Sequence, residues 1–418
     1  MKVNRIQIKE LFGHLDYNLD LDNLDLCIIT GPNGYGKTIL LKIINNALNG
    51  KFYFFEKLLF NEIVLTVNHI DIRINKIIAP LGAYTVLKSN NDEVNINIAG
   101  LEVNVDNEKF LYPFDLDYNL KNINYRDFET FYDIKEGLAK QRNIVSNEID
   151  NLFLDEGDVL FIMDQRIFEF KRNKQEAVLH SLSEEMKSIF SKYIYESNVI
   201  AQKLDGSFPL RVFERENKTY NLSMLKERLY GLTTQKEKYI SYGLLDESSI
   251  DDEQLSREMN SNESKEKLSV LELYLEDSLE KFKPYEFLLK KVKLFEDMVN
   301  KQGLAFKEIS VHRDHGILIR STNKNKETIE LSSLSSGEQN QIILLYNLIF
   351  KTNTKSLVLI DEPEISLHVA WQTNIVKNLE NIKQVNNIEQ FIIATHSPHV
   401  IDGNWKITLD LFESRGKK

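Results

Sequence analysis

The feature that most constrains the fold is a glycine-rich segment near the N-terminus, GPNGYGKT at residues 31–38. It follows an apolar run at residues 24–30 and precedes residues 39–48, whose apolar side chains have helical spacing. In a loop between a buried strand and a helix, glycines let backbone N–H groups turn inward around phosphate oxygens, and the helix N-terminus adds a favourable dipole. The segment therefore predicts an α/β fold with a phosphate-binding loop. The loop residues that we expect to contact phosphates are Gly31, Asn33, Gly34, Gly36, Lys37 and Thr38.

Two carboxylates at the end of an apolar run complement this loop. Residues 357–360 read Leu-Val-Leu-Ile, and Asp361 and Glu362 follow directly. In a chain with such a loop, Lys37 is expected to reach the β- and γ-phosphates of ATP, and Thr38 to ligate Mg²⁺. Asp361 would hold the Mg²⁺ shell, and Glu362 would polarise the attacking water. Together these residues predict an ATPase that uses Mg²⁺.

Two further segments carry polar residues suited to a γ-phosphate. His396 follows an apolar strand at residues 390–394, and open α/β sheets bind ligands at the carboxyl ends of their strands. Ser335 and Gly337 lie where a helix is predicted to begin, which makes a second anion site. The chain thus has two helix N-termini suited to phosphate but only one nucleotide-binding motif. This is explained if Ser335 and Gly337 of one copy bind the γ-phosphate held by another copy. The alternative is a serine that only caps its own helix.

The pattern of the whole chain predicts three regions, at residues 1–169, 170–304 and 305–418. The first joins the phosphate-binding loop to an antiparallel β section over residues 62–105, where apolar and polar residues alternate. The second is rich in helices. The third returns to an α/β pattern and contains both the carboxylates and the histidine. We therefore expect a nucleotide-binding fold made from both ends of the chain and interrupted by a helical insertion.

The last part of the insertion has a heptad-like seam. Apolar residues recur seven apart at Leu268, Leu275, Phe282 and Leu289. This spacing indicates an intramolecular helical hairpin, with a coiled coil between two chains as the alternative. Pro284 is expected to interrupt and kink the helix, since proline removes a backbone hydrogen bond.

Composition bears on partners and compartment. The formal net charge of −11 argues against a chain that coats DNA, because basic side chains supply most of the non-specific affinity for DNA, although a local basic patch is compatible with it. Cys27, the single cysteine, lies in an apolar run and is expected to be buried, with no disulfide or Cys-based metal cluster. No apolar stretch reaches membrane length, so we expect a soluble cytoplasmic protein without membrane contact.

These motifs, in this order, resemble those of the ATP-binding-cassette (ABC) clan, in the branch that contains SMC proteins, RecF and OLD-type ATPases. The resemblance covers residues 1–170 and 305–411. It implies an ABC-type P-loop NTPase head of two lobes, with a mixed sheet plus an antiparallel β section and a helical or short coiled-coil insertion. The motifs that it implies are Walker A at residues 31–38, the signature at residues 334–339, Walker B at residues 357–362 and the switch histidine at His396.

The resemblance implies two more elements. A Q-loop glutamine is expected before the insertion, as a catalytic residue and Mg²⁺ ligand, and Gln165 is the best match; a surface polar pair with Arg166 is the alternative. A D-loop is expected near residues 366–368, where His368 replaces the frequent aspartate. The signature also departs from the transporter pattern, since it reads Ser-Ser-Gly-Glu at residues 335–338. These departures and the insertion disfavour a transporter cassette.

The residues 31–38, 334–339 and 361–372 look like those of stand-alone AAA-type ATPases in bacterial anti-phage systems, such as the ATPase subunits of PARIS, Septu and retron-linked operons. This resemblance implies a head-to-head dimer, or a higher homo-oligomer, that acts as a nucleotide-driven switch or scaffold for a separate effector. The chain ends at Lys418, soon after the histidine, which leaves no room for the Toprim nuclease of OLD-type proteins. We therefore expect the effector, a toxin or a nuclease, to be a separate chain.

Two other functions stay open at this point. One is a DNA-repair or DNA-sensing ATPase similar to RecF or SMC proteins, and the other is a scaffold that binds ATP without hydrolysing it. For the residue that stacks on adenine, Phe12 and Tyr17 are the candidates.

Overall fold

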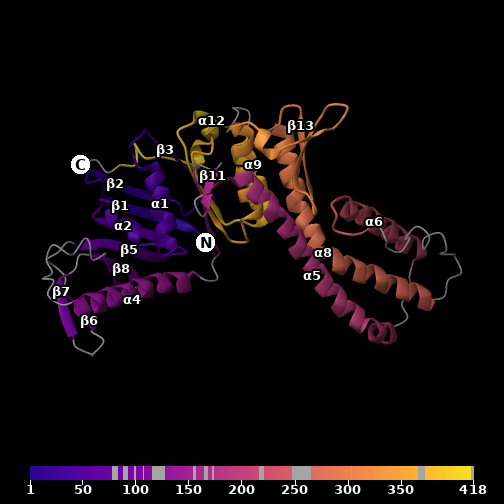
Figure 1. Cartoon of the computed structure of the whole chain (residues 1–418), viewed down its shortest axis with the longest axis horizontal. Coiled ribbons are helices and arrows are strands. Elements are labelled where there is room, and N and C mark those ends of the chain that lie inside the picture. Colours follow the sequence, from indigo (N-terminus) through magenta and orange to yellow (C-terminus); the bar gives the residue numbers. More distant parts are fainter. Residues whose placement is uncertain are drawn as a thin grey trace. The chain divides into compact units, whose positions relative to one another are not determined.

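The computed structural model describes residues 1–77, 83–87, 93–97, 100–106, 108–114, 128–153, 157–163, 168–171, 174–215, 221–246, 265–302, 304–365 and 372–415. The chain divides into two compact units (Figure 1). We call residues 1–165 with 350–418 the sheet unit, and residues 166–349 the helical unit. The three predicted regions stay a prediction, but residues 305–349 group with the helices of the insertion.

The core of the sheet unit is a parallel sheet. Within the described residues its five strands follow the order β10-β16-β17-β3-β18. Their bounds are Leu26–Thr30 (β3), Val159–Ile162 (β10), Leu357–Asp361 (β16), Gln390–Ala394 (β17) and Thr408–Asp410 (β18). Every residue of β16 and β17 is buried, as expected for parallel strands covered on both faces. The predicted strands before the glycine-rich loop, before the carboxylates and before the histidine are therefore confirmed.

A second sheet in this unit is antiparallel, with the order β2-β1-β4-β5-β8-β9. Its strands are Val3–Leu11 (β1), Leu15–Asp20 (β2), Glu62–Val67 (β4), Ile70–Ile77 (β5), Gly100–Val105 (β8) and Glu108–Pro113 (β9). The tight turn between β4 and β5 consists of Asn68 and His69, whose φ angles of 49° and 66° match the right-handed twist of a two-residue hairpin. A separate pair joins Ala83–Leu87 (β6) to Glu93–Asn97 (β7). The predicted antiparallel section is confirmed.

Helices complete the sheet unit. They are Lys37–Leu48 (α1), Tyr53–Lys57 (α2), Phe128–Leu152 (α4), Ile375–Asn386 (α11), Pro398–Ile401 (α12) and the 3₁₀ turn Trp405–Ile407 (η3). Helix α1 packs on β10, β16 and β17. The glycine-rich loop therefore connects the end of β3 to the start of a helix that covers the sheet. The sequence did not predict α4, which is held by polar contacts: Arg142 Nε donates to the Pro113 carbonyl at 2.8 Å, and Ser146 Oγ to the Gly50 carbonyl at 2.7 Å.

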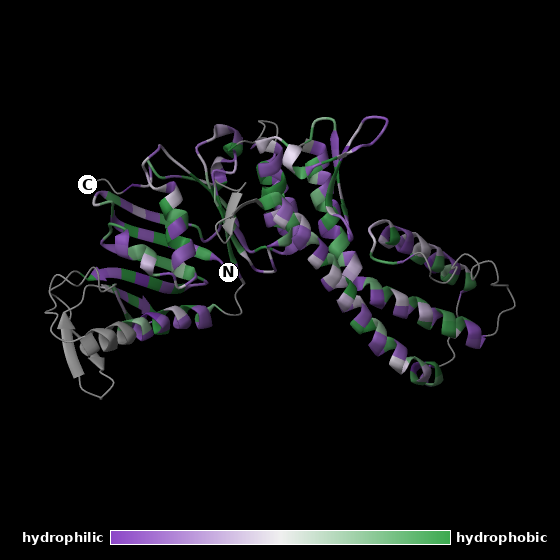
Figure 2. Ribbon diagram, in the orientation of Figure 1, coloured by the Kyte–Doolittle hydropathy of each residue, from purple (hydrophilic) through white to green (hydrophobic). Residues whose placement is uncertain are grey.

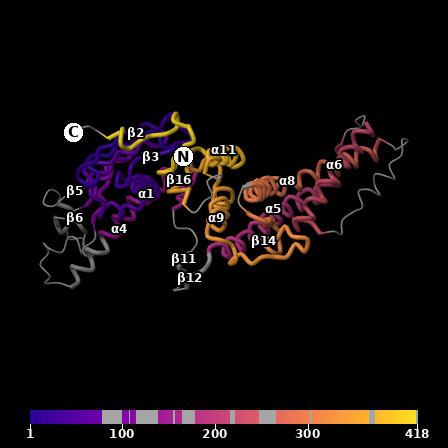
Figure 3. The backbone as a smooth tube through the Cα atoms, turned by 90° about the horizontal axis from the view of Figure 1, so that it is seen from above, coloured from indigo at the N-terminus to yellow at the C-terminus, as the bar shows by residue number. Residues whose placement is uncertain are grey.

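The helical unit combines long helices with small sheets. Its elements are Phe168–Lys171 (β11), Lys174–Ala177 (β12), Val178–Glu214 (α5), Leu222–Ser241 (α6), Lys265–Gln302 (α8), Lys307–His312 (β13), Gly316–Ser321 (β14), Thr328–Ile329 (β15), Leu331–Ser333 (η2) and Ser336–Phe350 (α9). Helices α5 and α8 lie side by side in both backbone views (Figures 1 and 3). Hydrophobic and hydrophilic residues alternate along both, which is expected of helices that bury one face (Figure 2).

The heptad-like seam of α8 is buried inside this chain. Leu225, Leu229 and Leu232 of α6 form an apolar cluster with Leu275, and Leu268 packs against it. The seam therefore serves an intramolecular packing of helices, which confirms the first of the two predicted interpretations.

The expected interruption at Pro284 is wrong, because α8 continues through this residue from Lys265 to Gln302. Aromatic packing accounts for this. Phe282 and Tyr285 stack on each other, with ring centroids 5.9 Å apart, and both contact Tyr239 of α6 at 5.3 and 5.4 Å. This contact on either side of Pro284 offsets the loss of one backbone hydrogen bond.

Cys27 is a free thiol and fully buried in β3, as predicted. Among the helices of the described segments, none has both the length and the apolar character that crossing a membrane would require.

The α6–α8 packing leads to a stability prediction. Leu229 is fully buried in this cluster, and Leu229→Ala removes its three outer carbon atoms, so the free energy of unfolding of the helical unit should fall by about 2–5 kcal/mol. Met224→Ala on the same helix is the matched control, because Met224 is 60% exposed and its loss should cost under about 0.5 kcal/mol. Amide hydrogen exchange of α6 and α8 measures both effects, and equal protection in the two variants would contradict the assigned packing.

Candidate nucleotide site

The parallel sheet brings three distant segments to one edge. Strand β17 pairs in parallel with β3 on one side and with β16 on the other. The carboxyl ends of the three strands therefore lie together, and each is followed by a predicted site segment: Gly31 after β3, Glu362 after β16 and His396 after β17. Ligands of open parallel sheets bind at this edge.

The glycine-rich loop has the backbone conformation that its sequence predicted. Gly36 is the N-cap of α1 with φ 80°, and a Cβ there would lie 3.2 Å from Leu11 Cδ2. Gly31 has φ 145°, and a Cβ there would lie 3.3 Å from Leu411 Cβ. Side chains at these positions would strain the backbone and crowd its neighbours. The loop thus places backbone N–H groups at the start of α1, where an anion is favoured.

Lys37 and Thr38 begin α1 and point to different partners. Lys37 is buried, and its Nζ donates to the Gly31 carbonyl at 2.9 Å. The ammonium group therefore connects the first residue of α1 back to the first glycine of the loop. Thr38 Oγ1 donates to Asp361 Oδ1 at 3.1 Å, which joins residues 323 positions apart. A hydroxyl and a buried carboxylate at this distance are hard oxygen ligands, so this pair fits Mg²⁺.

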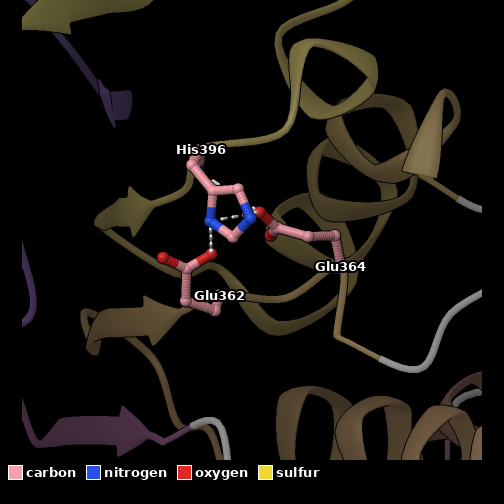
Figure 4. A group of neighbouring side chains, drawn as sticks. All are labelled: Glu362, Glu364 and His396. Carbon is pink, nitrogen blue, oxygen red and sulfur yellow. Dashed lines mark hydrogen bonds and ion pairs between the residues drawn. The ribbon is translucent and has the colours of Figure 1, made fainter. Parts of the chain in front are cut away.

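Glu362 and His396 face each other at the ends of β16 and β17 (Figure 4). Glu362 Oε2 lies 2.6 Å from His396 Nδ1, the distance of a close ion pair. The backbone of Glu362 has φ 45°, and its N–H donates to the Ala394 carbonyl at 2.9 Å, which extends the β16–β17 pairing past Asp361. The carboxylate is thus held on a strained, well-anchored residue beside an imidazole that is 57% exposed.

Glu364 is a site residue that the sequence analysis missed. Its side chain is 7% exposed, and Oε1 lies 3.6 Å from His396 Nδ1 (Figure 4). The same oxygen accepts from Thr395 Oγ1 at 2.5 Å. The signal was present in the sequence, since Asp361, Glu362 and Glu364 put a third carboxylate just after the strand. Its contact with the segment after β17 depends on strand pairing, which the local sequence does not reveal.

The electrostatics of the cluster affect Glu362 most. Burial raises the pKa of Glu362 to about 7, and the neighbouring Glu364 carboxyl group adds to the rise. His396 and Lys37 oppose it with their positive charge. A carboxyl group with a pKa near neutrality is well matched to accepting a proton from water at physiological pH.

The predicted signature lies in the helical unit. Ser335 precedes α9, where its Oγ donates to Glu338 Oε2 at 3.0 Å and accepts from the Glu338 N–H at 3.4 Å. The Ser335 N–H donates to Glu338 Oε2 at 2.9 Å, and Lys307 Nζ donates to Glu338 Oε1 at 2.7 Å. This is a capping box, in which Ser335 caps its own helix. Gly337 follows as the second residue of α9, and the predicted contact of both residues with another copy stays a prediction.

The other predicted residues differ in whether the structure describes them. Gln165 and the D-loop at residues 366–368 lie outside the described residues. Asn33 and Gly34 are exposed on the loop. The Tyr17 hydroxyl donates to the Tyr35 carbonyl of the loop at 2.7 Å, and the Tyr17 side chain is buried. Because a buried ring has no free face for adenine, Tyr17 is wrong as a base-stacking candidate. Phe12 is half-buried beside Gly36 and keeps that prediction open.

The loop, the strand-end carboxylates and the parallel sheet together define a P-loop ATPase domain. The family described as "AAA ATPase domain" matches residues 1–401, and the chain belongs to that family. The predicted AAA-type ATPase is thereby confirmed. The α/β fold with its parallel sheet, antiparallel section and helical insertion is confirmed as well.

Two proteins with similar sequences are named as probable ATPases of retrons. The chain is 26% identical over 302 residues to the retron Vc95 probable ATPase of Vibrio cholerae serotype O1 biovar El Tor, covering 66% of this chain and 55% of the relative. It is 36% identical over 89 residues to the retron Ec83 probable ATPase of Escherichia coli, covering 19% of this chain and 16% of the relative. The chain thus spans about half the length of the first relative and less of the second.

Solved SMC heads show a distant likeness. The Smc head domain from Pyrococcus furiosus, with an extended coiled coil and bound to the C-terminal domain of ScpA, has a TM-score of 0.37 at 13% identity, covering 96% of this chain and 90% of that one. The SMC head domain from Thermotoga maritima has a TM-score of 0.36 at 11% identity, covering 96% and 92%.

The raised pKa of Glu362 predicts the pH dependence of ATP hydrolysis. Below about pH 7 the carboxyl group is protonated and cannot accept a proton from water, so kcat/KM should fall about tenfold per pH unit there. Steady-state rates with Mg²⁺ in excess measure this. Glu389→Gln, which changes an exposed carboxylate beside β17, should leave the profile unchanged. A flat profile between pH 5.5 and 7 would contradict the assignment.

Proposed function

We propose that the chain binds ATP with Mg²⁺ and hydrolyses it at the edge formed by β3, β16 and β17. The observation that carries this proposal is the convergence, on one edge, of a phosphate-binding loop, the Thr38–Asp361 oxygen pair and the Glu362–His396 pair. Their residues come from three segments of the chain, at the carboxyl ends of β3, β16 and β17. A purely structural role would not need a buried lysine, a metal-type oxygen pair and a raised-pKa carboxyl group together.

In the proposed mechanism each residue has one task. Lys37 leaves the Gly31 carbonyl to contact the β- and γ-phosphates, and backbone N–H groups of residues 31–38 hold the remaining oxygens. Thr38 and Asp361 would hold Mg²⁺, which when bound neutralises charge on the phosphates. Glu362 takes a proton from the attacking water, and His396 holds the Glu362 carboxylate in position and can contact the γ-phosphate.

The site is proposed to close between two copies. Ser335 is exposed and directly precedes α9, and the N-terminus of a helix favours an anion. Lys307 balances the charge of Glu338 beside it, which favours the approach of a phosphate. In this proposal Ser335 and Gly337 of one copy contact the γ-phosphate on the other, and hydrolysis releases the pair.

We further propose that the ATPase acts as a switch or scaffold for a separate effector, a toxin or nuclease, in anti-phage defence in the cytoplasm, where ATP is available. The named retron ATPases among its relatives support this role. The alternative is a DNA-repair or DNA-sensing ATPase, which the net charge of −11 disfavours. Hydrolysis that DNA stimulates, and that weakens steeply as salt rises, would favour the alternative; co-purification of a toxin or nuclease would favour the effector role.

Replacement of Glu362 tests the catalytic assignment. Glu362→Gln keeps the shape of the side chain but cannot accept a proton, so kcat should fall by about a hundredfold or more while the Kd for ATP changes little. Phosphate release and a fluorescent-nucleotide titration measure the two effects. Glu413→Gln, at an exposed glutamate of the same unit, is the control and should behave as wild type. Full turnover in Glu362→Gln would reject its role as base.

Mixing two inactive variants tests the shared site. Lys37→Ala removes the phosphate contact of the loop, and Ser335→Arg blocks the α9 end, so each variant alone should be inactive. In an equal mixture half of the dimers pair the two variants, and each such dimer holds one intact site, which restores roughly a quarter of the wild-type rate. Asn325→Arg, on an exposed turn of the helical unit, should keep full activity. A mixture as inactive as its components would contradict the shared site.

A further inference from the structure

The carboxylate of Glu364 connects the ends of two neighbouring strands. It follows β16 by three residues, yet the described donors to its Oε1 all belong to the segment after β17. Thr395 Oγ1 donates at 2.5 Å, and the backbone N–H groups of His396 and Ser397 donate at 3.2 Å each. One buried oxygen thus accepts from the backbone of His396 and Ser397 and from the side chain of Thr395.

This arrangement explains why a carboxylate is present. Burying a charge is costly unless hydrogen bonds compensate it, and N–H groups that converge on an anion form strong bonds. Further contacts close the structure around Glu364: Ser397 Oγ donates to Gln372 Oε1 at 3.0 Å, and Gln372 Nε2 donates to the Glu364 carbonyl at 3.4 Å. The segment that bears His396 is therefore attached to the β16 end by side-chain and backbone contacts.

The position of His396 depends on these contacts. Its side chain is 57% exposed, so packing alone cannot hold the ring, and an exposed side chain loses conformational entropy when it is fixed. Its backbone N–H is bound by Glu364 Oε1, and the ring places Nδ1 2.6 Å from Glu362 Oε2 (Figure 4). Fixing the backbone on both sides of the residue narrows the range of positions that the ring can reach.

We infer that Glu364 is a positioning residue for ATP hydrolysis, which holds the turn after β17 so that His396 stays against the Glu362 carboxylate. This inference rests on the proposed function, in which Glu362 and His396 act on the attacking water and the γ-phosphate. The described contacts of Glu364 Oε1 are with Thr395, His396 and Ser397. Glu364 affects the rate of hydrolysis by positioning His396. A residue that only stabilises the fold would not depend on His396 in this way.

A double-mutant cycle tests this inference. Glu364→Ala should lower kcat by about ten- to a hundredfold and leave the KM for ATP within about twofold, because it misplaces a catalytic group without touching the phosphate contacts. In a His396→Ala background the same change should cost less than about twofold, since the group that Glu364 positions is gone. Glu364→Gln keeps one acceptor oxygen for the three donors, so it should recover much of the rate lost in Glu364→Ala.

Three results would overturn the inference, and they differ from one another. An equal loss in both backgrounds would show that Glu364 acts independently of His396. A loss in His396→Ala without a loss in Glu364→Ala would reject Glu364 and leave the proposed function intact. Full turnover in His396→Ala would reject both the inference and the role proposed for His396, and would leave ATP hydrolysis itself intact. Glu389→Ala, at an exposed glutamate next to β17, controls for lost charge and should match wild type.

A second variant keeps the test decisive if Glu364→Ala does not fold. Thr395→Val retains shape and removes only the hydroxyl that donates to Glu364 at 2.5 Å. It should lower kcat by about threefold, again without a change in KM and without further loss in the His396→Ala background. Thermal unfolding of each variant checks the fold. Wild-type kcat in a folded Thr395→Val, together with additive losses in the cycle, would contradict the inference.

Discussion

Strand β17 pairs in parallel with β3 and with β16, and the site depends on this double pairing. The phosphate-binding loop comes from the first tenth of the chain, whereas the carboxylates and the histidine come from the last part. Register sets which residues meet: Ala394 pairs with Asp361 on one side and with Ile29 on the other. Because the pleat alternates side chains between faces, a slip of one residue would move Asp361 away from Thr38. The hydrogen bond between them joins both ends of the chain at the site.

Buried charge is the second constraint on this edge. Lys37, Asp361 and Glu364 are all buried, and each has a polar partner in the described structure. Glu362 and Glu364 lie close enough that like charges and burial raise the pKa of Glu362, while His396 and Lys37 limit the rise. The arrangement separates the tasks of the two carboxylates: Glu364 is tied to the backbone after β17, and Glu362 faces the exposed imidazole.

The helical unit is organised by contacts of a different kind. Leucines of α6 and α8 form its apolar seam, and Asn300 and Glu296 of α8 hold the edge of β13 through the backbone N–H groups of Ile309 and Val311, at 2.8 Å each. From β13, Lys307 reaches Glu338 in the first turn of α9. The start of α9, where the proposed contact with a second copy lies, is therefore connected to the long helices by a continuous series of polar contacts.

The class of the site is readable from local sequence patterns alone. The glycine-rich loop, the apolar strands with terminal carboxylates and the histidine after β17 were readable because backbone turns, burial and helix starts leave local patterns. The sequence could not determine which residues after those strands meet, because that depends on the order and register of β16 and β17. Glu364 was missed for this reason. Tyr17 was misjudged because the burial of its side chain on β2 depends on tertiary packing. Likewise, only tertiary packing of Phe282 and Tyr285 against Tyr239 decided that α8 continues through Pro284.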